Sequence, residues 1–422
     1  MLSAEDNDVL CRVQGDAPMG RLMRRHWIPA CLSEEVVKPD GDPVAVRLLG
    51  EDLVLFRDTE GKLGALDAYC PHRRAPLVFG RNEQCGLRCL YHGWKFDTEG
   101  RVLDMASEPP GSRLAETVRA KAYPVHEAAG FVWVWLGAGA PASFVTPPWA
   151  PTEDTNISIV KMRVRCNWAQ VLEGAIDSAH SSSLHSTDMP SAAVKRSSAT
   201  RTAWLRPSTD KSPRLQVDVC DWGFRYAAIR KPSFDAETHD YIRATVFIAP
   251  FMALIPPNNQ YKLAQAIVPV DDETTMFHFI AWHETDGIGQ DTWRAFCAAT
   301  PGLDLEPDWT PIRSRENRYL QDRQAMRLGD FTGIRGIPAQ DIAMWEGMGK
   351  IADRTREYMG SSDLAIAHFR RQMVAAAKAA QDGADAIRPP PATVASFEGV
   401  VPKGSDWRAL TEAHAALHAA AD

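Results

Sequence analysis

The chain lacks the features that mark several classes of protein. It has no excess of positive charge, because 47 Lys and Arg residues stand against 54 Asp and Glu residues, a formal net charge of −7. It therefore has no basic footprint for nucleic acid or for an anionic membrane. Its first residues are acidic where a secretory signal would be basic. Its most apolar window, residues 128–142, is too short and too rich in glycine to span a bilayer. We expect a cytoplasmic protein that binds neither nucleic acid nor membrane.

Other patterns are missing as well. The eight cysteines are scattered along the chain, so a disulfide framework is not expected, and metal binding or plain burial is the better interpretation. There is no internal repeat and no low-complexity tract. No Gly-x-Gly-x-x-Gly motif follows a predicted strand, so the chain has no visible dinucleotide site.

The pattern of apolar residues changes along the chain and predicts two domains. From Pro43 to about Leu136, short β-type runs separated by turn residues predict an all-β domain. A stretch rich in Gly, Ala and Pro, residues 137–151, is the candidate boundary. Beyond it, long β-type runs bounded by helical patterns predict an α+β domain, a sheet gripped by helices. We expect an N-terminal helical segment over 1–40 that packs on the second domain, a first domain over 41–145, a second over 146–388, and a tail over 389–422.

Two pairs of Cys and His give the strongest signal in the sequence. Cys70-Pro-His72 is followed, sixteen residues later, by Cys89-Leu-Tyr-His92. Two His and two Cys from separate loops are the ligand set of a Rieske [2Fe–2S] centre, in which the His bind one iron and the Cys the other. Structural zinc is the main alternative, but its ligands usually pair Cys with Cys and His with His. Cys85 could replace Cys89 only by breaking the Cys-x-x-His spacing.

The residues that flank both Cys and His pairs favour the iron–sulfur interpretation. Cys-Pro-His-Arg-Arg-Ala-Pro-Leu and Cys-Leu-Tyr-His-Gly-Trp-Lys-Phe-Asp closely resemble the Rieske loops of ring-hydroxylating oxygenases. High-potential Rieske proteins carry an extra Cys beside each ligand pair, which forms a disulfide. Here Ala75 stands three residues after His72, so that bridge is absent and the cluster is expected to be of the lower-potential type.

A second constellation lies on a helical stretch that begins at about Asn167. Asp177 and His180 are three residues apart, so on a helix they share a face. His185 can join them only if the helix ends, and the serines at 181–183 favour such an end. Two His and one carboxylate with open positions form the facial triad of non-haem Fe(II) oxygenases. The alternative is that the two His are structural residues at a helix end, an interpretation disfavoured downstream of a Rieske motif.

The Asp-x-x-His-x₄-His pattern resembles the mononuclear-iron motif of Rieske oxygenases. The resemblance implies that His180 and His185 are metal ligands. It also implies that Asp177 is a bridge, not a ligand, and connects His180 to the Rieske residue His92 of a neighbouring subunit. Asp177, as this bridge, is a candidate catalytic residue. Asn167, at the start of the same stretch, is the second candidate.

The carboxylate ligand has to come from elsewhere in the chain. Asp322 and Asp341 are the candidates. The segment around Asp341 resembles the ligand-bearing helix of the family, so we choose Asp341 as the third iron ligand. Asp322 is expected to be an ion-paired structural residue beside Arg323.

From about residue 20 to 380 the chain resembles the phthalate-dioxygenase-type branch of Rieske non-haem iron oxygenases. Three sequence segments show this likeness, residues 249–260, 333–341 and 351–357. The resemblance implies a Rieske [2Fe–2S] domain, a helix-grip catalytic domain with mononuclear Fe(II), and a homotrimer that is stacked into a hexamer in some members. It also implies a separate NAD(P)H-dependent flavin and iron–sulfur reductase, which supplies the electrons for O₂ activation.

The substrate follows less directly from the sequence. Enzymes of this branch hold aromatic carboxylates, and the fork of Arg suits a carboxylate. Arg206 and Arg243 lie in the right region, and Ser181 follows a predicted iron ligand; the alternative for both arginines is a surface or ion-paired role. We expect cis-dihydroxylation of a phthalate- or chlorobenzoate-like acid, with O-demethylation or diaryl ether cleavage as the alternative. A Rieske electron carrier is the alternative of another class, but it has no use for the second motif.

Overall fold

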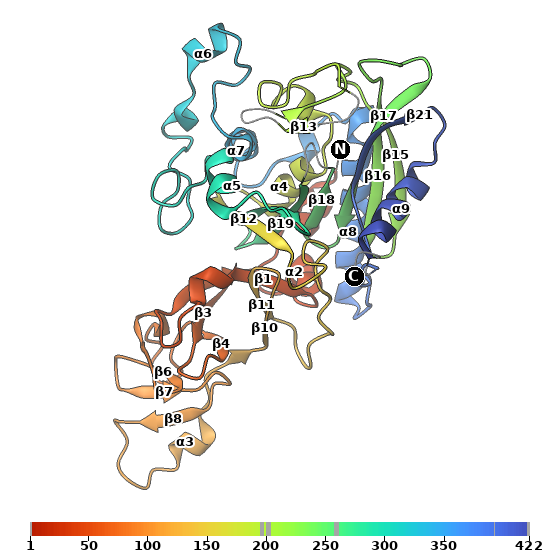
Figure 1. Ribbon diagram of the computed structural model, residues 1–422. Coiled ribbons are helices and arrows are strands. Elements are labelled where there is room, and N and C mark those ends of the chain that lie inside the picture. Colours follow the sequence, from red (N-terminus) through yellow and green to blue (C-terminus); the bar gives the residue numbers. More distant parts are fainter. Residues whose placement is uncertain (1, 195–197, 200–203, 257–260, 392, 420–422) are drawn as a thin grey trace. The chain divides into compact units, whose positions relative to one another are not determined.

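The computed structural model describes residues 2–194, 198–199, 204–256, 261–391 and 393–419. Their contacts divide the chain into two compact units, one of residues 13–144 and one of residues 1–12 and 145–422 (Figure 1). Residues 13–40 thus group with the first β domain, although the sequence suggested that they pack on the second. The reason is that β1 (Trp27–Leu32) pairs along its length with β11 (Phe131–Trp135). No helix among the described residues is long and apolar enough to cross a membrane.

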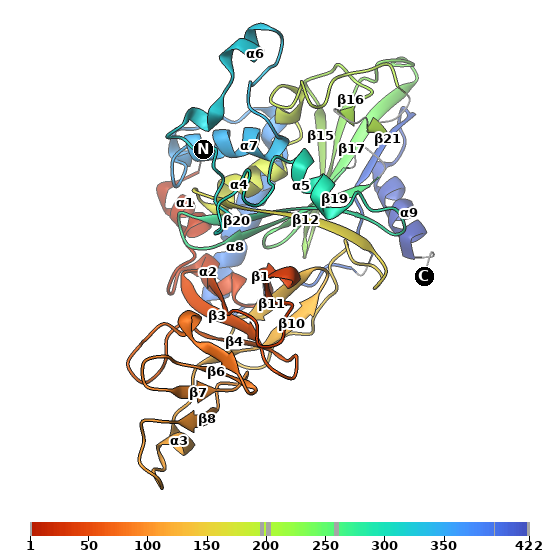
Figure 2. The same ribbon diagram turned by 60° about the vertical axis from the view of Figure 1, so that its left-hand side comes forward.

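The unit of residues 13–144 consists of three small antiparallel sheets, as the view in Figure 2 shows. Their strand orders are β1-β11-β10, β2-β3-β4-β9 and β5-β6-β7-β8. The remaining elements are α2 (Pro18–Met23), β2 (Val44–Leu48), β3 (Glu51–Arg57), β4 (Leu63–Asp67), β5 (Arg81–Glu83), β6 (Gly86–Arg88), β7 (Trp94–Phe96), β8 (Val102–Met105), α3 (Leu114–Thr117), β9 (Ala122–Tyr123) and β10 (Val125–Ala128). Its core joins Val54, Phe56 and Phe96 to Cys70 and Cys89, so both predicted cysteine ligands belong to the packed interior.

The second unit is built on an antiparallel sheet in the order β12-β20-β19-β18-β17-β16-β15. Its strands are β12 (Asn156–Val164), β15 (Arg214–Cys220), β16 (Gly223–Arg230), β17 (His239–Ile248), β18 (Met252–Ile255), β19 (Lys262–Pro269) and β20 (Thr275–His283). The first half of β17 pairs with β21 (Phe397–Pro402) and its last residues pair with β18. The predicted tail therefore contributes a strand to this sheet.

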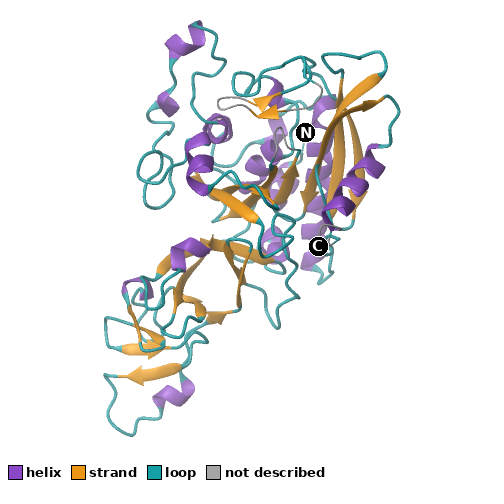
Figure 3. Cartoon of the chain, in the orientation of Figure 1, coloured by secondary structure: helices purple, strands orange, loops and turns teal. Residues whose placement is uncertain are grey.

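Helices cover both faces of this sheet (Figure 3). Side chains alternate between the faces of a strand. On one face, Phe247 packs against Phe369 of α8 (Leu364–Gln381), with their ring centroids 5.4 Å apart. Phe369 in turn packs against Trp168 of α4 (Trp168–Ala175), with a centroid distance of 5.8 Å. On the other face, Trp407 of α9 (Trp407–Ala419) joins a cluster with Ala227 and Ile229. The helix-grip prediction is confirmed. The other helices of the unit are α1 (Ala4–Cys11), α5 (Gln290–Phe296), α6 (Arg323–Arg327) and α7 (Ile337–Gly347).

Gly174 allows α4 to lie directly against α7. A Cβ atom at this position would approach the indole Nε1 of Trp345 to 2.2 Å and Cε2 to 2.6 Å. Both helices carry predicted iron-site residues at or near their ends, so this close approach brings the two segments together.

Replacement of Gly174 by Ala is therefore expected to destabilise the protein by roughly 1–3 kcal/mol, because overpacking outweighs the better helix propensity of Ala. Thermal unfolding should show a lower Tm. Gly347→Ala in α7 is the matched control, since a Cβ atom there meets nothing within 4 Å. An unchanged Tm in the Gly174 variant would contradict the packing argument.

Candidate metal centres and active site

The two loops that carry the Cys and His pairs have the same backbone design. In each loop the cysteine amide donates to the carbonyl five residues on, and the amide four residues on donates back to the cysteine carbonyl. The first loop does this with Ala75 (2.8 Å) and Arg74 (2.9 Å), and the second with Trp94 (2.8 Å) and Gly93 (3.0 Å). Arg74 and Gly93 both adopt positive φ, 58° and 74°. This matched pair of turns places the two cysteines in equivalent positions, while His72 follows its cysteine by two residues and His92 follows by three.

The four side chains of these loops converge in a way that fits a [2Fe–2S] cluster. The rings of His72 and His92 lie 4.4 Å apart, and the ring of His72 stacks on Trp94 at 4.3 Å. Nδ1 of His72 is buried and has no hydrogen-bond partner among the described residues. A buried polar atom without a partner is costly, and a metal bound at Nδ1 would satisfy it. Cys70, His72, Cys89 and His92 could therefore hold the cluster.

The thiols have the burial that a metal site requires. Cys70 and Cys89 are both buried and form no disulfide. Burial raises the pKa of the Cys70 thiol to about 11. A coordinated metal deprotonates such a thiol outright, so the metal and the buried thiolates stabilise each other.

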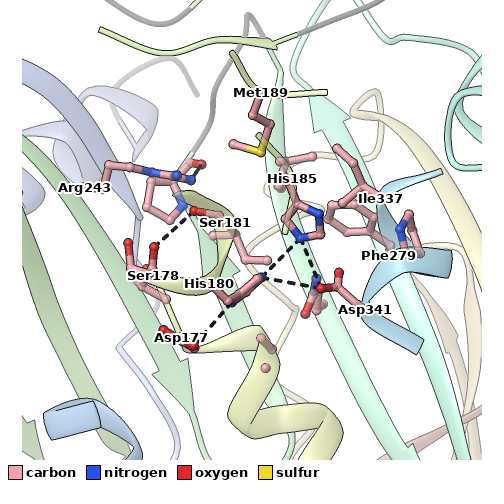
Figure 4. Close-up of a pocket in the computed structure, with 18 of the residues that line it drawn as sticks. Asp177, Ser178, His180, Ser181, His185, Met189, Arg243, Phe279, Ile337 and Asp341 are labelled. Atoms are coloured by element: carbon pink, nitrogen blue, oxygen red, sulfur yellow. Dashed lines mark hydrogen bonds and ion pairs between the residues drawn. The ribbon is translucent and has the colours of Figure 1, made fainter. Parts of the chain in front are cut away.

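His180, His185 and Asp341 converge on one point in the second unit (Figure 4). The Nε2 atoms of the two His are 3.2 Å apart, and Oδ1 of Asp341 lies 3.1 Å from Nε2 of His185 and 3.5 Å from Nε2 of His180. This is possible because α4 ends at Ala175 and a short 3₁₀ turn, His180–Ser182, replaces it. Asp341 arrives from the first half of α7. The three atoms could hold one metal ion and leave other positions open.

Gln340 orients one of these ligands, and the sequence analysis did not identify it. Its Nε2 donates to Oδ2 of Asp188 at 2.7 Å and to the carbonyl of Ile334 at 2.9 Å. Its Oε1 therefore faces Nδ1 of His185, at 2.7 Å, as an acceptor. The proton of His185 then sits on Nδ1 and the lone pair of Nε2 points at the metal position, as metal-bound imidazoles require. The sequence offered one signal for Gln340, which is its position directly before the predicted ligand Asp341.

Asp177 plays the corresponding part for His180. Its Oδ2 lies 3.6 Å from Nδ1 of His180, and its Oδ1 accepts from the amide of Ala179 at 2.7 Å. Burial raises the pKa of this carboxyl, but the contact with His180 outweighs burial and the pKa is lowered overall. Burial also lowers the pKa of His180, and the carboxylates of Asp177 and Asp341 outweigh that effect. Asp177 is therefore an ionised group that faces His180 from the side away from Asp341.

Two other candidate residues do not reach this point. Asn167 is fully buried, but its Oδ1 caps α4 through the amide of Ala169, and its Nδ2 donates to the carbonyls of Cys11 and Asp272. Its geometry is that of a structural cap. Asp322 caps α6 by accepting from the amides of Gln324 and Ala325.

The triad opens into a cavity that is lined by strands β17 to β20 of the sheet and by helices α4 and α7. Ser178, Ser181 and Arg243 contribute polar groups to its lining, and apolar walls are formed by Ile255, Pro256, Leu263, Phe277, Phe279 and Ile337. Figure 4 places Arg243 and the serines on one side of the two histidines and Phe279 on the other. An aromatic acid fits such a lining, with its carboxylate at the polar end.

Three buried arginines surround the polar end of the cavity. Arg243 lines it, and Arg206 reaches Ser181 and Ser182 with Nη1, at 3.5 and 3.4 Å. Arg230 donates through Nη2 to the carbonyl of Ser178 at 2.7 Å. The Nε atoms of all three are buried and without a hydrogen-bond partner among the described residues.

Arg230 was not predicted. It is the last residue of β16, and the alternation of side chains along a strand places it on the same face as Tyr226. Burial first, and then the charge of Arg243, lowers the pKa of Arg230 to about 10 and also lowers that of Arg206.

Comparisons with known proteins agree with this geometry. A model of the Rieske [2Fe-2S] domain matches residues 26–124, and one described as LigXa C-terminal domain like matches residues 134–421. The chain is 54% identical to the phthalate 4,5-dioxygenase oxygenase subunit of Pseudomonas putida, over 97% of this chain and 94% of that one. It is 36% identical to the 3-chlorobenzoate-3,4-dioxygenase oxygenase subunit of Comamonas testosteroni, over 98% of each. The crystal structure of dicamba monooxygenase bound to dicamba has the same fold, with a TM-score of 0.58 at 19% identity over 85% of this chain and 98% of that one.

Proposed function

This chain belongs to the Rieske non-haem iron aromatic ring-hydroxylating oxygenases, as their oxygenase component, and from that premise we propose that it cis-dihydroxylates an aromatic dicarboxylate of the phthalate type. The protein carries a Rieske [2Fe–2S] cluster and mononuclear iron, which when bound supply electrons and activate O₂. It is one component of a system in which a separate protein delivers the electrons. We infer that this protein is an NAD(P)H-dependent reductase.

The positive charge of the buried arginines favours a substrate with two carboxylates. Besides burial, the charge of Arg243 lowers the pKa of both Arg206 and Arg230, and the carboxylate of Glu398 counters this effect at Arg206. Glu398 stands directly opposite Arg243 in the pairing of β17 with β21, and it accepts a hydrogen bond from Tyr241. Three positive charges and one negative charge leave an excess of two. A substrate with two carboxylates neutralises this excess, whereas a chlorobenzoate supplies one negative charge.

The metal ligands in this proposal are Cys70, His72, Cys89 and His92 for the cluster and His180, His185 and Asp341 for the iron. Arg243, Arg206 and Ser181 bind the carboxylates, so that the ring lies between the apolar walls. In the structure, the O–H of Ser181 donates to the carbonyl of Ser178 at 3.1 Å, and its Oγ accepts from Nη1 of Arg206 at 3.5 Å. To bind a carboxylate, the hydroxyl would turn from that carbonyl and donate its one proton to the substrate.

We further propose a head-to-tail homotrimer in which the Rieske loops of one copy face the iron site of the next. A second cavity reaches His180 and Asp177 from outside, and its lining includes exposed apolar side chains, among them Tyr358 (96% exposed), Met348 (56%) and Phe331 (51%). The Rieske loops also expose apolar groups, Leu90 (61%) and Tyr91 (56%). Apolar groups exposed to this extent beside functional residues support a protein interface. In this arrangement Asp177 would lie between His180 and His92 of the neighbouring copy.

The decisive experiment is a product analysis. Iron-loaded protein is incubated with a matching reductase, NADH and one substrate: phthalate, 3-chlorobenzoate, a vanillate-type methoxybenzoate or a diaryl ether. The masses of the products are measured by mass spectrometry. A gain of two oxygens and two hydrogens on phthalate is expected. Loss of CH₂ from the methoxybenzoate, with formaldehyde release and no reaction of phthalate, would refute the proposal and favour O-demethylation.

Arg243→Gln is expected to raise KM for phthalate by on the order of 10- to 100-fold, with a smaller effect on kcat, because a charge-assisted contact is worth about 1.5–3 kcal/mol. The loss should be smaller for 3-chlorobenzoate, which needs less positive charge. Arg243→Lys keeps the charge without the planar fork and should fall between. Arg225→Gln is the control, because Arg225 lies on the neighbouring strand and pairs with Asp218 and Glu412. Equal losses for both acids would contradict the dicarboxylate argument.

A further inference from the structure

Gln265 is a polar side chain in the apolar part of the cavity, and no described residue gives its Oε1 a hydrogen bond. It lies in β19 and lines the cavity that opens from the metal triad. Its side chain is buried, with 6% of the residue exposed, and its Oε1 has no hydrogen-bond partner among the described residues. Such an atom costs about 1–3 kcal/mol when it is left unpaired.

The surroundings of Gln265 offer it no polar neighbour across the sheet. Its partners in register are Ala253 on β18 and Phe279 on β20, neither of which has a polar side-chain atom. Leu263, two residues earlier on the same strand, lines the cavity beside it. A bridging water needs two or more polar partners, and these side chains provide none. Gln265 therefore brings to the lining of this cavity an acceptor, Oε1, that has no partner among the described residues.

Gln265 lies away from the carboxylate-binding end. Figure 4 shows Arg243, Ser178 and Ser181 on one side of His180 and His185, and Phe279 on the other side. Since Gln265 pairs with Phe279 in register, it belongs to the Phe279 side of the cavity. An aromatic acid held by its carboxylates at Arg243 would thus direct the opposite edge of its ring toward Gln265.

We propose that Gln265 determines specificity by accepting a hydrogen bond from a hydroxyl group on the ring edge remote from the carboxylates. This rests on the proposed function, because the carboxylates set the orientation of the ring. A buried acceptor favours an O–H donor over an apolar group of similar size, since the apolar group leaves the acceptor unpaired. The ligand class is therefore a ring-hydroxylated aromatic dicarboxylate.

The test compares two ligands of similar size, 4-hydroxyphthalate and 4-methylphthalate. Their dissociation constants are measured by anaerobic calorimetry on the metal-loaded protein, together with that of phthalate. The wild-type protein is expected to bind the hydroxy acid more tightly than the methyl acid. Gln265→Leu should lower this hydroxy-to-methyl ratio of affinities by about 3- to 10-fold, the change expected for the loss of one hydrogen bond. Leu263→Met is the matched control, because it reshapes the same wall without removing a polar group, and it should keep the wild-type ratio.

The outcomes separate this role from the function on which it rests. Phthalate binding with the same hydroxy-to-methyl ratio in the wild type and the Leu variant would overturn the role of Gln265 alone. A wild-type protein that binds none of the three acids would overturn the proposed function and this role with it. Gln265→Asn, which withdraws the amide by one methylene, should also lower the ratio, and it serves if the Leu variant does not fold.

Discussion

The Asp177→Asn protein is expected to bind both metal centres and to lose product formation by on the order of 100-fold in kcat. The three atoms that could hold the iron, Nε2 of His180 and His185 and Oδ1 of Asp341, are untouched by the change. The backbone turn should also persist, because the side-chain oxygen of Asn can still accept from the amide of Ala179. What is lost is a negative charge facing Nδ1 of His180 at 3.6 Å.

That charge matters for two reasons within the proposed assembly. It fixes the ring of His180 with its proton on Nδ1, which leaves the Nε2 lone pair for the metal. Asp177 also lines both cavities that meet at the triad, the one assigned to substrate and the outer one assigned to the neighbouring copy. Asp341 lines both cavities as well, but it faces Nε2 of His180, on the metal side, whereas Asp177 faces Nδ1. In the proposed assembly Asp177 is therefore the carboxylate that would join His180 to His92 of that copy.

The measurement needs three readings on one sample: iron content, the visible absorbance of the Rieske cluster, and the rate of product formation. Asp177→Glu keeps the charge but moves it by one methylene, so its rate should lie between those of the wild type and the Asn variant. Full turnover in the Asn variant with both metals present would remove Asp177 from its bridging role. Loss of iron together with activity would instead make it a support for the ligand His180 alone.

Much of the fold was predictable because its signals are local. Apolar runs indicated strands in both units. The helix was expected to continue to His180 and to end at the serines that follow, but α4 ends earlier, at Ala175, and His180 begins a separate 3₁₀ turn. The tail was not predictable in this way. Residues Phe397–Pro402 join the sheet only by pairing with the first half of β17, and no local pattern reports such a distant partner.

The site shows the same division between local and distant information. His180 and His185 lie within six consecutive positions of the sequence. Gln340 and Arg230, in contrast, matter only because folding brings them to Nδ1 of His185 and to the carbonyl of Ser178. Gln265 is the extreme case. Within an apolar strand pattern it is a single polar interruption, and only the structure shows that it lines a cavity and that its Oε1 has no partner among the described residues.

Asp341 was chosen over Asp322 because its segment resembles the ligand-bearing helix of the family, and in the structure Asp341 lies with His180 and His185. This leads to the second large effect. Asp341→Ala is expected to abolish stable iron binding at the triad and, with it, product formation. Oδ1 of Asp341 lies within 3.5 Å of both histidine nitrogens, so its removal leaves two neutral imidazoles for a dication that binds through two His and a carboxylate. The Rieske cluster belongs to the other compact unit, so its absorbance should persist at the wild-type level.

Asp322→Ala is the matched control for this experiment, since both residues were candidates for the same ligand. Asp322 accepts from the amides of Gln324 and Ala325 at 2.8 and 2.9 Å as the cap of α6. Its loss should cost about 1 kcal/mol of stability and leave the iron content unchanged. Iron is measured by elemental analysis after dialysis, beside cluster absorbance. Retention of iron by the Asp341 variant, or its loss from the Asp322 variant, would contradict the ligand assignment, because only a carboxylate that reaches both His180 and His185 can complete the triad.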